Sequence, residues 1–177
     1  MFEALEQQLV GKETLGSFGV DYIKSLGLAL RSFRAHEQIE NAVLKPAYLA
    51  LGPQGETFVK ECSTFHEKVA PSLMQMETVA MGMIPSTKAE IDSLCESIKM
   101  FAKAFQTHSK AEEVTFLTVI QAKIDGQAQN TLCADFIKET TAANKRQGLA
   151  SPTPSSMGMG KSGMEMAAAA AVNSFKV

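Results

Sequence analysis

The chain has 177 residues, of which 45% are hydrophobic, and this length and composition suit one folded domain with a substantial core. Its formal net charge of -2 comes from interspersed positive and negative residues, so no basic surface of the kind that binds nucleic acid is expected. The longest apolar run, 167–172, is far too short to cross a membrane, so no membrane contact is expected either.

The cysteines Cys62, Cys95 and Cys133 are widely spaced and form no Cys-x-x-Cys motif. A disulfide framework is therefore not expected, and the pattern favours a reducing compartment in which the cysteines act as small core residues. The first residues contain no basic stretch followed by an apolar one, which a secretory signal would have. We therefore expect the protein to be cytoplasmic.

Apolar residues recur with helical spacing along most of the chain, and no segment alternates convincingly with the period of a strand. In chain order, the predicted helices cover residues 3–10, 21–51, 56–83, 87–123 and 130–145. A chain of amphipathic helices without strands predicts an all-α fold, because each helix must bury its apolar stripe against another helix.

Prolines and a capping motif subdivide these helices. Pro46 falls inside 21–51 and should kink that helix or mark its last turns, and Pro71 interrupts the following helix in the same way. Thr87 and Glu90 have the spacing of a capping box, in which each side chain accepts a hydrogen bond from the other residue's backbone. The third long helix is therefore predicted to begin at this motif.

The composition changes after about residue 147 to serine, proline, glycine, methionine and alanine without helical periodicity. We expect residues 1–146 to form the helical bundle and residues 147–177 to be a disordered tail, because such a segment cannot bury enough apolar surface to fold.

Four methionines gather toward the end of the predicted helix 56–83. They are Met74, Met76, Met81 and Met83. A copper-binding methionine patch is one interpretation of this cluster. Flexible packing in the core is the expected one, because the unbranched thioether fills irregular gaps.

All three histidines lie in predicted helices, and two of them begin a His-x-x-x-Glu pair. The pairs are His36 with Glu40 and His108 with Glu112, and residues four apart lie on the same face of a helix. Each pair therefore directs an imidazole and a carboxylate toward one place, as in the carboxylate-rich metal sites of helical bundles. His66 lies on the intervening helix, where an antiparallel bundle can bring it to the same depth. Nitrogen and carboxylate ligands without thiolate favour iron or manganese over structural zinc.

Two segments around these pairs carry a family resemblance. Residues 33–41 read Phe-Arg-Ala-His-Glu-Gln-Ile-Glu-Asn, and residues 105–116 contain His-x-x-x-Glu-Glu followed by an apolar turn. Both are similar to the ligand helices of the hemerythrin-like (HHE cation-binding) family. The first is especially similar to the hemerythrin-like iron-sensing domain of the F-box ubiquitin ligase subunit. The resemblance covers about residues 1–145 and implies an up-down antiparallel helical bundle of the hemerythrin type.

The resemblance also implies which residues bind metal. The common ligand set of the family falls on His36, Glu40, His66, His108 and Glu112. The two glutamates of this set would bridge the metals. Glu37 matches the extra carboxylate of the iron-sensing variant, and a solvent-facing glutamate beside the site is the alternative. The chain departs from the family on its first helix, where Glu3 stands at the position of a histidine and would be its substitute.

A member of this family would hold two iron ions, which an oxo or hydroxo group can bridge, and would bind dioxygen or a related small molecule. We expect iron and dioxygen binding for sensing, storage or scavenging rather than catalysis. One alternative is a di-iron enzyme that acts on peroxide, nitric oxide or dioxygen. Another is a helical interaction protein that binds no metal, and no feature of the chain identifies a protein partner.

Overall fold

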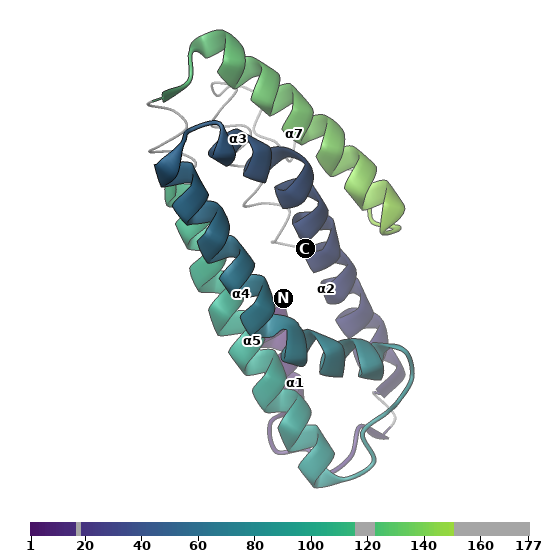
Figure 1. Cartoon of the computed structure of the whole chain (residues 1–177). Coiled ribbons are helices and arrows are strands. Elements are labelled where there is room, and N and C mark those ends of the chain that lie inside the picture. Colours follow the sequence, from purple (N-terminus) through teal and green to yellow (C-terminus); the bar gives the residue numbers. More distant parts are fainter. Residues whose placement is uncertain (17–18, 116–122, 151–177) are drawn as a thin grey trace. The chain divides into compact units, whose positions relative to one another are not determined.

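The structure is a computed structural model that describes residues 1–16, 19–115 and 123–150. Its elements are helices, and no strand occurs among the described residues (Figure 1). They are α1 (Phe2–Leu9), α2 (Gly19–Ile39), the π-helix η2 (Glu40–Leu44), α3 (Lys45–Leu49), α4 (Pro53–Ala80), α5 (Lys88–Thr115) and α7 (Gly126–Arg146). The predicted all-α fold is therefore confirmed. None of the described helices is long and apolar enough to span a membrane.

Local hydrogen bonds explain where two of the helices begin. Before α5, the hydroxyl of Thr87 accepts from the Glu90 N–H at 3.3 Å, and the Glu90 carboxylate accepts from the Thr87 N–H at 3.1 Å. The predicted capping box is thus confirmed. α7 begins before the predicted residue 130, because the Asp125 carboxylate caps it by accepting from the Ala128 N–H at 2.8 Å.

Two predicted segments lie outside the described residues. The expected continuation of the third long helix to residue 123 runs into 116–122, and most of the expected tail falls in 151–177. Both expectations stay predictions.

The described residues form two compact units. The first consists of Met1–Leu30 and Thr64–Thr107, and the second of Arg31–Ser63 and the described residues from His108 onward. α2, α4 and α5 each contain residues of both units. The assignment of 1–146 to a single bundle and its up-down arrangement stay predictions.

Aromatic rings join α1 to α5 in the first unit. The ring centroid of Phe2 lies 4.6 Å from that of Phe101 in an edge-to-face contact, and Phe101 stacks on Phe105 at 5.7 Å. Burying one large apolar side chain stabilises a fold by about 1.5–3 kcal/mol. Phe2 therefore fixes the start of the chain to α5.

The methionines of α4 do not all lie in the core. Met76 is fully buried and Val79, one turn later, is buried as well, so this face of the helix points inward. Met74, Met81 and Met83 are exposed. The prediction of core packing is correct for Met76 and wrong for the other three, because Met74 lies on another face of α4 and Met81 and Met83 follow its last residue, Ala80.

The second unit has its own apolar core, built from α2, η2, α3, α4 and α7. Its buried members are Ala35, Ile39, Val43, Leu44, Tyr48, Phe58, Cys62, Cys133, Phe136 and Ala143. The Tyr48 and Phe58 rings meet edge to face, with centroids 4.5 Å apart. Cys62 and Cys133 therefore act as small core residues, as predicted, whereas Cys95 is half-buried.

Candidate metal centre

The second unit brings both His-x-x-x-Glu pairs together. His36 is in the last turn of α2 and Glu40 is the first residue of η2, while His108 and Glu112 lie one turn apart on α5. The four side chains are buried and offer ligand atoms that all lie within 4.8 Å of one another. The predicted convergence of these two pairs is therefore present in the structure.

A turn of π-helix follows His36 at this point. The Lys45 N–H donates to the carbonyl oxygen of Glu40, five residues earlier, instead of the residue four before it. Pro46 comes next and has no N–H to continue the α-helical pattern. Widened turns of this kind are frequent at functional sites, and here the turn begins at a candidate ligand.

The imidazole nitrogens face the carboxylate oxygens. His36 Nε2 lies 3.4 Å from Glu112 Oε2 and 4.0 Å from Glu40 Oε2. His108 Nε2 lies 3.6 Å and 3.9 Å from the same two oxygens. The two imidazole rings meet edge to face, at 79° with centroids 5.7 Å apart.

These separations fit ligands around one metal ion. Imidazole and carboxylate ligands lie about 2.1 Å from a divalent transition metal, so two ligands of one ion are at most about 4.2 Å apart. All four nitrogen–oxygen distances are below this limit. The group could therefore hold a metal ion between its two nitrogens and two oxygens.

Burial makes the charge of the group important. Glu40 is fully buried and Glu112 is nearly so. With neutral imidazoles, these two carboxylates bring two negative charges into a buried place, and Lys45 brings one positive charge to within 3.7 Å of Glu40 Oε1. Because an uncompensated buried charge is costly, a cation at the site would be stabilised.

Tyr48 and Cys62 lie near the same carboxylates. Burial raises the pKa of the Tyr48 hydroxyl, and the charge of Glu112 raises it further. Burial likewise raises the pKa of the Cys62 thiol, with added contributions from Glu40 and Glu112. Both groups therefore keep their protons at neutral pH in the metal-free protein. The Tyr48 hydroxyl has no hydrogen-bond partner within the described residues.

Three predicted ligands are not members of this group. Glu37 pairs with Arg34 on its own helix, at 2.6 Å, and its role as a ligand stays a prediction. Glu3 is exposed on α1, and His66 is half-buried on α4 with its ring 5.2 Å from that of Phe65. Glu3 and His66 belong to the first unit, and their roles as ligands stay predictions.

Comparison of the chain with known protein families, curated proteins and solved structures finds no match. The chemistry of the His/Glu group, defined as His36, Glu40, His108 and Glu112, is therefore the basis for a functional assignment.

Proposed function

We propose that the protein is a non-heme iron protein of the hemerythrin type, and that the His/Glu group holds iron. The observation that carries this proposal is the convergence of two imidazole nitrogens and two carboxylate oxygens in a buried place, at separations that suit a single ion. Burying these four side chains without a bound cation would cost free energy, because both carboxylates lose their hydration.

Iron is the metal that this ligand set favours within the proposal. Imidazole and carboxylate ligands suit iron and manganese, whereas structural zinc sites usually contain cysteine. Cys62 lies near the group, and burial raises the pKa of its thiol, so its deprotonation for metal binding would cost free energy. The resemblance of residues 33–41 and 105–116 to hemerythrin-like proteins supports iron in preference to manganese.

Each side chain of the group has a distinct role in this proposal. His36 and His108 bind as neutral imidazoles through Nε2, and Glu112 Oε2 lies between both of them. Glu40 directs Oε2 toward the imidazoles, while Lys45 holds its other oxygen, Oε1. Iron held by these ligands would supply one-electron chemistry and a binding position for a small molecule such as dioxygen.

A second iron ion would need a carboxylate that bridges through both oxygens. Lys45 lies beside Glu40 Oε1, so its ammonium group competes with a second cation there. His36, His108, Glu112 and Glu40 Oε2 would therefore hold the first ion, and Lys45 would have to leave Glu40 Oε1 before that oxygen could bind a second one. Sensing, storage or scavenging of iron and dioxygen is the proposed role, with an iron enzyme as the alternative.

Metal analysis of the purified chain tests the proposal, with an optical spectrum after anaerobic loading with Fe(II) and exposure to air. We expect at least one iron per chain and a higher melting temperature, since binding to the native state alone stabilises a protein by about 2.7 kcal/mol at a hundredfold excess over Kd. Glu112→Gln should lose iron and the thermal shift. Glu113→Gln is the matched control, because Glu113 is the exposed neighbour on the same helix.

The possible results separate the alternatives. A chain that takes up no iron and keeps its melting temperature would be the metal-free interaction protein. Tighter binding of Mn(II) than of Fe(II), which reverses the usual order of affinities, would reject iron but keep the metal site. Turnover of peroxide or nitric oxide that disappears in His108→Ala would select the enzyme.

A further inference from the structure

Three exposed methionines stand near the end of α4, in the first unit. Met74, Met81 and Met83 have relative exposures of 67%, 77% and 65%. Methionine is normally among the more buried residue types, so three exposed thioethers within ten residues need a reason. Two of them form the motif Met-Gly-Met, which the chain repeats at residues 157–159 outside the described residues.

The backbone at the end of α4 places Met83 next to an earlier turn of the helix. The Met81 N–H still donates to Glu77 O at 2.9 Å, so the helical path continues to Met81. The Gly82 N–H then donates to Val79 O and the Met83 N–H to Thr78 O, at 2.9 and 3.2 Å. This is a Schellman motif, and the φ of Gly82, +100°, is the positive value that such a motif requires.

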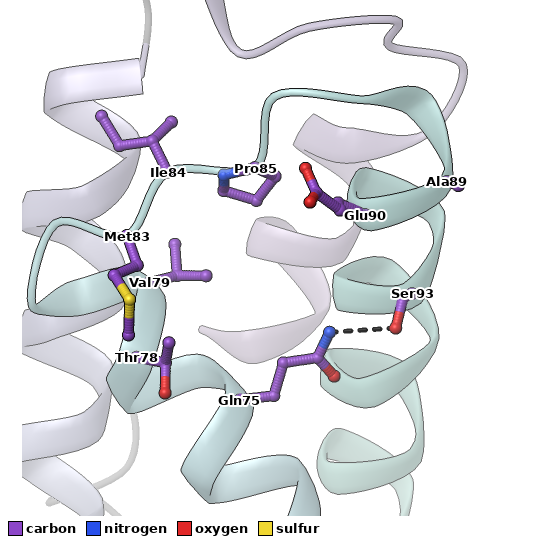
Figure 2. Close-up of a pocket in the computed structure, with 9 residues that line it drawn as sticks. All are labelled: Gln75, Thr78, Val79, Met83, Ile84, Pro85, Ala89, Glu90 and Ser93. Carbon is purple, nitrogen blue, oxygen red and sulfur yellow. Dashed lines mark hydrogen bonds between the residues drawn. The ribbon is translucent and has the colours of Figure 1, made fainter.

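The backbone positions of Met74, Met81 and Met83 therefore all lie near Thr78. Met74 and Met81 lie four residues before and three residues after Thr78, which places all three on one face of the helix. Figure 2 shows the Met83 side chain beside Thr78 and Val79, at the wall of an open pocket. Methionine has a flexible side chain, so thioethers on neighbouring turns can approach one another.

This arrangement has the chemistry of a soft-metal site. Thioether sulfur selects Cu(I) over harder cations, and three neutral ligands suit a monovalent ion. The end of α4 also carries the negative end of the helix dipole, which favours a cation. We propose that Met74, Met81 and Met83 form a binding site for Cu(I). This site is independent of the proposed iron centre, because its ligands and its compact unit are different.

Methyl-resolved NMR of the full chain, labelled at the methionine methyl groups and titrated anaerobically with Cu(I), tests the proposal. We expect the methyl signals of Met74, Met81 and Met83 to shift together. The signal of Met100, which is 59% exposed on α5, should stay in place. Competition with a chromophoric Cu(I) chelator should show at least about tenfold weaker binding at this site in Met81→Leu and in Met83→Leu.

Met100→Leu is the matched control and should leave the affinity unchanged. Leucine keeps the apolar volume, and the replaced side chains are exposed, so folding should be unaffected. The proposal is rejected if only the signals of residues 157, 159, 164 and 166 move with Cu(I). It is also rejected if Met81→Leu and Met83→Leu bind Cu(I) like the unchanged chain.

Discussion

Lys45 brings a positive charge to the buried His/Glu group even when no metal ion is bound. Its ammonium group lies 3.7 Å from Glu40 Oε1 and also donates to Asn41 Oδ1 at 2.8 Å. A cation bound by the group would be repelled by this ammonium. In a metal-free protein, by contrast, Lys45 offsets part of the charge of Glu40.

Replacing Lys45 should therefore raise the affinity for a metal ion and lower the stability of the metal-free protein. In Lys45→Met we expect about tenfold tighter Fe(II) binding, since a repelling charge is removed, and a lower melting temperature without metal. Chelator competition and thermal melts with and without Fe(II) measure both. Lys24→Met is the control, because Lys24 is an exposed lysine paired with Asp21. Equal shifts in both variants would contradict a specific role for Lys45.

Gly55 controls how closely α4 approaches α3. A Cβ atom at this position would lie 1.7 Å from the carbonyl oxygen of Tyr48, so the backbone would have to shift. We expect Gly55→Ala to lower the free energy of unfolding by about 3 kcal/mol, as a strongly overpacked site does. Chemical denaturation measures this change. Gly126→Ala should cost little, because nothing lies within 4 Å of its added Cβ.

At the scale of elements, the π-helix η2 links Pro46 to the candidate ligand Glu40. Pro46→Ala would restore an N–H and allow an ordinary α-helical turn between α2 and α3. Residue 45 would then lie about 140° around the helix from Glu40, and Lys45 would leave the carboxylate. The geometry of the His/Glu group therefore depends on this proline.

For Pro46→Ala we expect unchanged or higher thermal stability together with an altered affinity for Fe(II). The gain comes from better helix propensity, and the altered affinity comes from a displaced Glu40 and Lys45. Pro71→Ala is the matched control, since Pro71 also lies inside a helix but is exposed on α4. Pro71→Ala should raise the thermal stability without changing the affinity for Fe(II). The same affinity for Fe(II) in Pro46→Ala as in the parent chain would argue against the π-turn as a determinant of the site.

At the scale of the whole molecule, the buried thiol of Cys62 makes stability depend on pH. Its pKa is raised in the folded protein by burial and by the Glu40 and Glu112 carboxylates, from an ordinary value of 9.0. The folded protein therefore keeps this proton at a pH where the unfolded chain has lost it. The resulting stability is complete below about pH 9 and is lost as the pH rises further.

We expect the free energy of unfolding of the metal-free protein to fall between about pH 9 and about pH 10.5. Denaturant titrations at several pH values measure the slope. In Cys62→Ala the curve should start lower, because a cavity is created, but it should fall less steeply. Parallel curves for the two proteins would show that this thiol does not titrate differently in the folded state.

Much of the helical organisation and the inner part of the site could be predicted from the sequence. His36, Glu40, His108 and Glu112 follow the rule that residues four apart share a helix face, and this rule holds from the end of α2 into η2 and within α5. Lys45 could not be found in this way, because it is five residues from Glu40 and reaches it across a π-turn.

Other differences have equally local causes. Arg34 and Glu37 are three residues apart, which is an ordinary spacing for an ion pair on a helix. The sequence could therefore have predicted this pair as well as a ligand role for Glu37. The methionines of α4 were grouped by their nearness in sequence, although only Met76 lies on the inward face. The placement of Glu3 and His66 depends on contacts between distant segments, which a helical pattern does not determine.

The order of the chain also affects when the His/Glu group can form during synthesis. Its first pair lies in Arg31–Ser63, its second pair begins at His108, and Thr64–Thr107, a segment of the other unit, separates them. Closing such a long segment is slow, because its entropy must be lost before any contact is gained. A ribosome must therefore release Glu112 before the nascent chain has all four side chains, so the proposed binding of a metal ion by this group would come late in the protein's synthesis or after it.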